Sequence, residues 1–360
     1  MSITVEDVKA ALCKVVDPNT TKDFIATKSV RNLKVENGQI GLDIELGYPA
    51  KSQIEPIRAS VLAALQGFGL PVSLNVYSKI IAHTVQRGLK PLPNVKNIIA
   101  VASGKGGVGK STTAVNLALA LAAEGATVGV LDADIYGPSQ PMMLGVSGRP
   151  VTKDGKSMEP MEGHGVQVSS IGFLIDPDEP MVWRGPMVTQ ALQQLLDQTN
   201  WRDLDYLVID MPPGTGDIQL TLSQKVPVTG AVIVTTPQDI ALLDARKGLK
   251  MFEKVGIPIL GVVENMSTHI CSNCGHVEEI FGAGGGEKMT QDFKVDFLGK
   301  LPLKMSIREQ TDSGKPTVVA DPDGAVAGIY REIARKVAIR VAEKAKDMTS
   351  KFPTIVVKND

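Results

Sequence analysis

The stretch that decides the fold is IIAVASGKGGVGKS, residues 98–111. Its first five residues are apolar, as in a buried strand, and a helical pattern follows the glycine-rich part. The template G-x-x-x-x-G-K-[ST] is met at Gly104, Gly109, Lys110 and Ser111. The glycines let backbone N–H groups turn toward phosphate oxygens, and the helix N-terminus adds partial positive charge. The stretch therefore predicts a phosphate site in which Lys110 reaches the β/γ-phosphates and Ser111 binds Mg²⁺.

Apolar runs of the same kind recur along the chain. Besides 98–102 they are found at 127–131, 206–209, 231–235 and 259–263. Runs that are apolar throughout are typical of strands covered by helices on both faces. Helical patterns such as Ser111–Glu124 lie between them. We therefore expect an α/β fold, with the doubly wound, mostly parallel sheet of a P-loop NTPase domain and ligands at the carboxyl ends of its strands.

The first 85 residues form a smaller pattern of their own. Strand-like runs at Val30–Val35 and Ile40–Leu46 are joined by Asn37-Gly38, a strong hairpin signal. Helical spacing covers Val5–Lys14 and Ile54–Gln66. We predict a small α+β domain at 1–85, a linker at 86–95, the P-loop domain at 96–347 and a C-terminal tail at 348–360.

The composition excludes several classes of protein. Of the 360 residues 43% are hydrophobic and 21% charged, as in a folded globular chain rather than a disordered one. A net charge of −1 argues against dominant binding to a nucleic-acid backbone. No apolar run reaches the roughly 18 residues needed to cross a bilayer, and the N-terminus lacks a targeting signal. The expected compartment is the cytoplasm, where the 3 cysteines would not form a disulfide framework.

Aspartates follow two of the apolar runs, where the strands should end. Asp132 and Asp134 come after the run at 127–131, and Asp210 comes after the run at 206–209. Carboxyl ends of parallel strands meet at one edge of a sheet, so these carboxylates should lie beside the phosphate site. Asp210 has the Walker B position, which holds Mg²⁺ directly or through water. The residues that follow it, 211–217, are rich in glycine and proline and suit a switch that senses the γ-phosphate.

A second candidate site is the pair Cys271 and Cys274 in a turn-rich segment. Two thiolates at this spacing supply half of a four-ligand set. Two copies of the chain could complete it around a bridging iron–sulfur cluster. Alternatively, His269 and His276 could complete a zinc site in one chain, although this spacing is tighter than in zinc fingers. A redox pair, or two reduced thiols in a turn, are further alternatives. Cys13 lies in an apolar stretch and is predicted to be part of the core.

The additional lysine in the loop, Lys105 within GKGGVGKS, makes it resemble the loop of the MinD/nitrogenase-iron-protein ATPases. The resemblance implies ATP as the nucleotide, with Lys105 reaching across a homodimer to the partner's ATP. It also implies that Asp134 orients the attacking water, that Asp132 helps to arrange Mg²⁺, and that Asn265 contacts adenine. The residues implied in ATP binding or catalysis are Gly104, Lys105, Gly106, Gly107, Val108, Gly109, Lys110, Ser111, Thr112, Asp134, Asp210 and Asn265.

Longer motifs from about residue 96 to 340 resemble the Mrp/ApbC family of iron–sulfur cluster carrier ATPases. They are DADIYGPSQP at 132–141, WRGPM at 183–187, DMPPGTGD at 210–217, FGAGGGEKM at 281–289 and DSGKP at 312–316. The resemblance implies a homodimer that holds a [4Fe–4S] cluster between two Cys271/Cys274 pairs, hydrolyses ATP and passes the cluster to apo-proteins, with assembly scaffolds as further partners. LDIELGYPAKS at 42–52 resembles a small metal–sulfur cluster assembly domain, although Asp17-Pro18-Asn19 departs from its usual Asp-Pro-Glu.

Two other functions stay open on sequence grounds. One is a positioning ATPase of the MinD/ParA kind with a structural zinc site, which would act on membrane or DNA. The other is an electron-transfer reductase of the nitrogenase-iron-protein kind, whose cluster ligands come from separated cysteines rather than an adjacent pair. The basic amphipathic pattern at Ala325–Lys346 could lie on a membrane, but its small apolar face favours docking onto the sheet. We expect no stable membrane association and no nucleic-acid partner.

Overall fold

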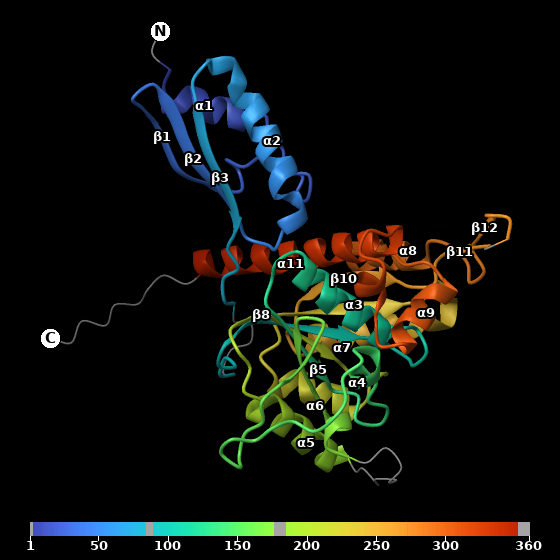
Figure 1. The fold of residues 1–360 in the computed structure, drawn as a ribbon. Helices are drawn as coiled ribbons and strands as arrows, with labels where there is room; N and C mark the ends of the chain where they lie inside the picture. Colours follow the sequence, from blue (N-terminus) through green and yellow to red (C-terminus); the bar gives the residue numbers. More distant parts are fainter. Residues whose placement is uncertain (1–2, 84–88, 176–184, 272, 352–360) are drawn as a thin grey trace. The chain divides into compact units, whose positions relative to one another are not determined.

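The computed structural model describes residues 3–83, 89–175, 185–271 and 273–351. Parts of the predicted linker (86–88), of the WRGPM motif (183–184) and of the predicted tail (352–360) lie outside the described residues. The chain divides into two compact units, Met1–Ile81 and Ala82–Asp360, and each is described by itself (Figure 1).

The first unit pairs a three-stranded sheet with helices. Its elements are α1 (Val5–Leu12), β1 (Val30–Glu36), β2 (Gln39–Leu46), η1 (Lys51–Gln53), α2 (Ile54–Leu65), η2 (Gln66–Phe68) and β3 (Val72–Ser78). The strand order is β1-β2-β3, with β1 antiparallel and β3 parallel to β2. Asn37 and Gly38 have φ angles of 51° and 72°, the left-handed pair that a tight hairpin turn needs. The predicted hairpin is confirmed.

Cys13 directly follows α1 and is exposed, so its predicted place in the core was wrong. The buried residues of this helix are Val8 and Leu12, which lie four apart on one face. Cys13 comes one residue later and therefore points away from that face. An apolar neighbourhood in the sequence was not enough to bury it.

The turn after α1 is built around a buried carboxylate. Asp17 accepts hydrogen bonds from the Tyr48 hydroxyl (2.8 Å), the Asn19 N–H (2.9 Å) and the Thr20 hydroxyl (3.1 Å). The Asn19 side-chain amide also donates to Asp17 (3.3 Å) and to the Tyr48 hydroxyl (3.2 Å). An amide suits this place because it donates to the buried carboxylate, whereas glutamate would add a second negative charge. The departure from Asp-Pro-Glu is therefore accommodated locally.

The second unit contains an eight-stranded sheet with helices on both faces. Its strands are β4 (Val95–Ala102), β5 (Val128–Asp132), β6 (Met161–Gly163), β7 (Val166–Ser170), β8 (Leu204–Asp210), β9 (Gly230–Thr235), β10 (Ile259–Glu264) and β13 (Phe297–Lys300), and a separate hairpin is formed by β11 (His269–Ile270) and β12 (Val277–Glu278). Its helices are α3 (Lys110–Ala123), α4 (Gln140–Met143), η3 (Ile171–Phe173), α5 (Gly185–Gln198), α6 (Asp217–Lys225), α7 (Asp239–Lys254), α8 (Gly285–Phe293), α9 (Met305–Asp312), α10 (Thr317–Ala320) and α11 (Ala325–Lys351).

The strand order of the large sheet is β13-β10-β9-β4-β8-β5-β7-β6. All neighbouring pairs are parallel except β6–β7, which confirms the predicted mostly parallel sheet. The five apolar runs of the sequence form its centre, β10, β9, β4, β8 and β5. The neighbouring β7 was missed because its buried residues include Gln167, Ser169 and Ser170, whose polar side chains are hydrogen-bonded.

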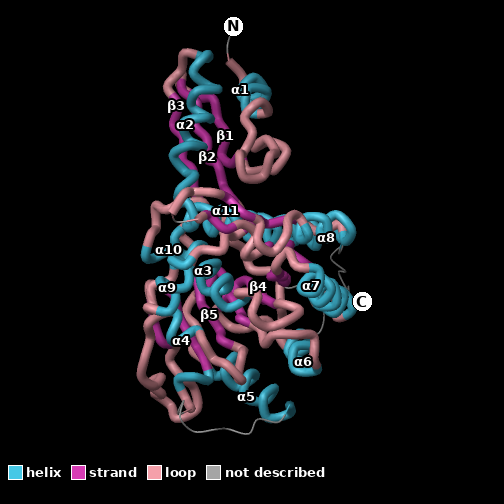
Figure 2. The backbone as a smooth tube through the Cα atoms, turned by 90° about the vertical axis from the view of Figure 1, so that its right-hand side faces the viewer, coloured by secondary structure: helices cyan, strands magenta, loops and turns pink. Residues whose placement is uncertain are grey.

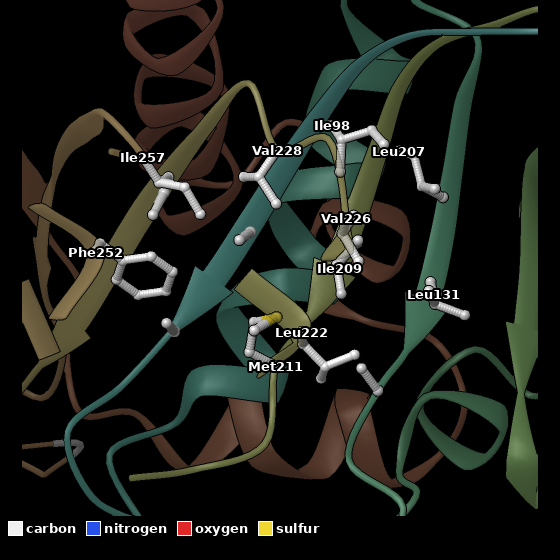
Figure 3. Packing of buried hydrophobic residues seen from close by; sticks show 14 of the residues in the cluster. Ile98, Leu131, Leu207, Ile209, Met211, Leu222, Val226, Val228, Phe252 and Ile257 are labelled. Carbon is white, nitrogen blue, oxygen red and sulfur yellow. The ribbon is translucent and has the colours of Figure 1, made fainter. Parts of the chain in front are cut away.

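The two faces of the sheet are covered by different helices (Figure 2). On one face α3 packs against β5 and β8, and α11 packs against α3 and β13. On the other face a continuous apolar cluster joins α5–α8 to the sheet. Figure 3 shows Leu222 of α6 and Phe252 of α7 in this cluster with Ile98, Leu207 and Ile209 of β4 and β8. Burial on both faces explains why these strands are apolar throughout.

The sequence predicted that the long C-terminal helix docks onto the sheet, and α11 packs against α3 and the strands β13 and β10. Ile333, Val337 and Val341 recur at helical spacing and are all buried. Arg335, 14% exposed, forms an ion pair with the fully buried Glu124 carboxylate at the end of α3 (2.6 Å). Among the helices of the described residues, none combines the length and the apolar character needed to span a bilayer.

Replacing Arg335 by methionine removes a charged partner of the buried Glu124 carboxylate. We expect the second unit to lose about 3 kcal/mol of unfolding free energy. Trp183 and Trp201, the 2 tryptophans of the chain, belong to this unit, so urea unfolding followed by tryptophan fluorescence reports on it. Arg246→Met, which breaks the exposed Arg246–Asp292 pair, is the control and should cost less than about 1 kcal/mol. Equal costs would contradict a stabilising role for the buried pair.

Candidate nucleotide and thiolate sites

The glycine-rich loop lies between β4 and α3 and is fixed on two sides by close contacts. A Cβ at Gly104 would lie 2.1 Å from the backbone carbonyl carbon of Asp244 in α7. A Cβ at Gly109 would lie 2.2 Å from the side-chain nitrogen of Asn265, and the φ of Gly109 is +80°. Packing therefore favours glycine at both positions of the template, and at Gly109 the left-handed backbone favours it as well.

The side chains predicted for the phosphate site gather around one buried ammonium. Lys110 donates hydrogen bonds to the carboxylate of Asp210 and to the hydroxyl of Ser111 (3.1 Å). Its Nζ also lies 3.8 Å from the Asp134 carboxylate. The structure thus brings together Lys110 and Ser111 of α3, Asp210 at the end of β8 and Asp134 in the loop after β5. In this arrangement the Lys110 ammonium forms ion pairs with the carboxylates that border the predicted phosphate site.

The carboxylate of Asp132 organises the loop after β5. Its Oδ2 accepts from the N–H groups of Ser139 (2.9 Å) and Gln140 (3.0 Å) and from the Ser170 hydroxyl (3.1 Å). Its Oδ1 accepts from the N–H of Asp134 (3.2 Å). Burial, with a contribution from the neighbouring Asp210 charge, raises the pKa of Asp132 to about 7. These contacts favour a role in shaping the loop over direct contact with a ligand.

The pKa of Asp134 is also raised, chiefly by burial, with Lys110 opposing the shift and Asp210 adding to it. A partly desolvated carboxylate with a raised pKa is suited to orienting a water or accepting its proton. The hydroxyl of Ser111 and the carboxylates around Lys110 are hard oxygen donors, the ligands that Mg²⁺ prefers. The residues present therefore fit a magnesium–nucleotide site.

The remaining loop residues are distributed as follows. Lys105 is half-buried, and its carbonyl accepts a hydrogen bond from the Ser103 hydroxyl (2.8 Å). Gly106 and Gly107 are exposed, Val108 is buried, and Thr112 in the first turn of α3 is half-buried. Among the described residues, no carboxylate lies within ion-pair distance of the Lys105 ammonium.

Asn265 is hydrogen-bonded to the loop itself. Its side-chain amide donates to the carbonyl of Val108 (2.9 Å). The contact with adenine stays a prediction, since the structure assigns this amide to holding the loop. The preceding residue, Glu264, is fully buried at the end of β10 and accepts from the N–H of Gly286 in the first turn of α8 (2.6 Å).

Sequence reasoning missed Glu264 and also Gln140, which donates to Asp210 (2.9 Å) from the start of α4. Glu264 carried a usable signal, because an acidic residue that ends an apolar strand is the pattern that identified Asp210. Gln140 carried none, since a glutamine in a loop motif does not by itself indicate a site.

The two cysteines lie on the β11–β12 hairpin, which stands out from the body of its unit (Figure 1). The N–H of Cys271 donates to the carbonyl of His276, and the N–H of Gly275 donates to the carbonyl of Cys271 (2.9 Å each). Hydrogen bonds from the N–H groups of Cys274 and Asn273, with one from the Cys274 thiol, lower the pKa of the Cys271 thiol. Cys274 is exposed, and Ser272 lies outside the described residues.

Among the described residues, neither histidine completes a zinc site with the two cysteines. The Nδ1 of His269 lies 3.2 Å from the carbonyl oxygen of Leu303, and the Nε2 of His276 lies 3.8 Å from the Glu278 carboxylate. In the described part of the chain, no group of three or more histidine, cysteine, aspartate or glutamate side chains could hold a metal ion. A four-ligand zinc site within one chain is therefore not formed by these residues.

The β4–loop–α3 arrangement, with aspartates at the ends of β5 and β8, defines the second unit as a P-loop NTPase. Residues 94–338 match the family described as NUBPL iron-transfer P-loop NTPase, and the chain belongs to that family. Residues 5–76 match the family described as iron-sulfur cluster assembly protein. The predicted fold class and family resemblance are confirmed.

Two curated relatives are named iron-sulfur cluster carrier protein. The iron-sulfur cluster carrier protein of Pseudomonas fragi is 67% identical over 257 residues, which cover 71% of this chain and 90% of the relative. The iron-sulfur cluster carrier protein of Synechocystis is 47% identical over 354 residues, 95% of this chain and 99% of the relative.

Solved structures share the fold of the second unit. The nucleotide-binding protein of Archaeoglobus fulgidus, in complex with ADP, is 36% identical with a TM-score of 0.56, over 64% of this chain and 90% of that chain. The cell division ATPase MinD of Pyrococcus furiosus is 24% identical with a TM-score of 0.51, over 67% of this chain and 98% of that chain.

Two glycines of the loop should respond differently to a methyl group. Gly104→Ala forces the new Cβ into the backbone of α7, and we expect it to destabilise the second unit by about 2 kcal/mol. Gly106→Ala is the control, because a Cβ there meets nothing within 4 Å and its φ is not in the left-handed region. Tryptophan fluorescence during urea unfolding measures both. Similar costs would show that α7 does not confine the loop.

Cys271 should react as a thiolate at lower pH in the folded protein than in the unfolded chain. N–H groups that donate to its sulfur favour the charged form, so the fraction of thiolate at neutral pH is increased. Iodoacetamide labelling of the reduced, metal-free protein across a pH series, with peptide mass analysis, compares native and urea-unfolded samples. The exposed Cys13 is the internal control, because its labelling shows how the reactivity of iodoacetamide itself changes with pH and urea in the same samples. Coincident Cys271 profiles in the two states would contradict the hydrogen-bond assignment.

Proposed function

We propose that the protein is an ATP-dependent iron–sulfur cluster carrier. A homodimer binds the cluster through the Cys271 and Cys274 pairs of both chains, hydrolyses ATP and transfers the cluster to apo-proteins. The observation that carries this proposal is the exposed cysteine hairpin, with the Cys271 thiolate favoured by backbone N–H groups, on a P-loop NTPase unit. The names of the curated relatives support it.

The number of cysteines favours a cluster shared by two chains. A [4Fe–4S] cluster takes four thiolates, whereas the chain has 3 cysteines in all. Two hairpins supply four thiolates without recruiting Cys13. Apolar side chains beside the pair, Ile270, Val277 and Ile280, are 42%, 56% and 53% exposed, which suits contact with another protein surface. A second copy and then an apo-protein acceptor are the partners we propose, in the cytoplasm, with assembly scaffolds as the source of the cluster.

The nucleotide half of the proposal assigns a role to each side chain around Lys110. ATP phosphates enter the loop at 104–112 and draw Lys110 away from Asp210 and Asp134. Ser111 and Asp210 would hold Mg²⁺, which when bound would neutralise charge on the phosphate oxygens. Asp132 keeps its loop in place, Asp134 orients the attacking water, and Lys105 meets the nucleotide of the partner chain.

Contacts at both ends of the cysteine segment provide a route from nucleotide to cluster. Asn265 holds the loop through Val108, and Cys271 follows it by six residues. After the hairpin the chain enters α8, whose first turn is held by the buried Glu264 through Gly286. We propose that a displacement of the loop by nucleotide reaches the hairpin through this segment and changes the exposure of the cluster.

Anaerobic reconstitution with iron and sulfide tests the cluster assignment. We expect a brown dimer with about four irons per two chains, measured by visible absorption, metal analysis and light scattering. Cys271→Ala and Cys274→Ala should each abolish the cluster while ADP binding, measured by calorimetry, is kept. Cys13→Ala is the matched control and should retain the cluster. A colourless protein with zinc, or a cluster that survives Cys271→Ala, would overturn the proposal.

A further inference from the structure

Gln140 is a fully buried amide that connects three parts of the nucleotide site. Its side-chain Nε2 donates to Asp210 Oδ2 at the end of β8 (2.9 Å) and to the carbonyl of Ser111 in the first turn of α3 (3.2 Å). Its backbone N–H donates to Asp132 at the end of β5 (3.0 Å). One residue therefore ties the glycine-rich loop to both strand ends that carry aspartates.

The Gln140 amide is an uncharged donor beside two buried carboxylates that repel each other. Asp132 and Asp210 are direct partners in the register of β5 and β8, and both are 0% exposed. Lys110 donates to one oxygen of Asp210, and Gln140 donates to the other. An amide satisfies this buried carboxylate oxygen without adding a charge that would compete with Lys110.

The other half of the same amide has no partner. Gln140 Oε1 is buried and accepts no hydrogen bond from any described residue. A buried acceptor without a donor is costly, so a native structure that retains one usually supplies a donor in another state. A water of a hydrated cation that arrives with the nucleotide is such a donor, since Mg²⁺ keeps several waters when it binds phosphates.

We propose that Gln140 is a positioning residue for the magnesium–nucleotide complex. Its Nε2 fixes the Asp210 carboxylate relative to Ser111, and its Oε1 accepts a hydrogen bond from a water of the Mg²⁺ shell. Gln140 touches neither the nucleotide nor the metal and acts through Asp210, Ser111 and that water. This inference rests on the proposed Mg²⁺–nucleotide site, and it is independent of the cluster.

The test is the affinity for ADP, measured by calorimetry with Mg²⁺ and with EDTA instead of Mg²⁺. Gln140→Met keeps the length of the side chain and removes the donor and the acceptor. We expect its affinity for ADP to fall about 10-fold or more when Mg²⁺ is present and to stay at the wild-type value in EDTA. A loss of the same size in both conditions would overturn the proposal, because it would show a general effect on the loop.

Gln167→Met is the matched control. Gln167 is a buried glutamine in β7 whose amide makes two hydrogen bonds with the backbone of Arg202, at 2.8 and 2.9 Å, and none with the nucleotide site. It should cost comparable stability in urea and leave both ADP affinities unchanged. If Gln140→Met gives the same result as this control, Gln140 is only structural and the proposal is wrong.

Gln140→Asn provides the same test if the Gln140→Met variant does not fold. Gln140→Asn keeps the amide and withdraws it by one methylene from Asp210, so the same loss confined to Mg²⁺ is expected. Wild-type affinity in both conditions would overturn the proposal. If the wild-type protein binds ADP equally well with and without Mg²⁺, the proposed magnesium site fails and this inference fails with it, whereas a failure of the variants alone leaves that site standing.

Discussion

The buried ammonium of Lys110 is the interaction on which the nucleotide site depends. Parallel neighbours β5 and β8 end in register at Asp132 and Asp210, so the fold places two carboxylates side by side where water is excluded. Like charges in such a place repel strongly unless a cation or hydrogen-bond donors compensate them. Lys110 supplies the cation, and the loop after β5 supplies N–H groups to Asp132. Under the proposed function, the same repulsion favours the binding of a divalent cation.

The fold also determines which movements of the loop are possible. Gly104 is pressed against the backbone of α7, while Gly109 and Val108 are held by Asn265 at the end of β10. A shift of the loop would therefore disturb the contact with α7 or the hydrogen bond from Asn265. β10 leads directly into the segment that carries the cysteines, and the proposed route from nucleotide to cluster uses this connection.

Sequence reasoning succeeded where one local property decided the structure. Strands β4, β5, β8, β9 and β10 were predicted because burial on both faces makes them apolar throughout, and the loop was predicted because its glycines are required by backbone geometry. It failed where partners are distant. Gln140 lies 70 residues from Asp210 and Glu264 lies 22 residues from Gly286, and no local pattern shows either pairing. For Cys13, composition indicated burial, whereas the end of α1 at Leu12 decided the opposite.

The brevity of the β11–β12 hairpin has a consequence for the release of cargo. Two-residue strands have little stability of their own in water, and the residues from Asn273 to Ile280 are exposed. In the proposed carrier, part of the free energy of metal–thiolate bonding is spent on ordering the hairpin, so the net affinity for the cluster is lower than that of the same thiolates on a rigid scaffold. An acceptor whose ligands are already in place has no such cost. The proposed transfer is then favoured in one direction, from a site that must be ordered to one that is already ordered.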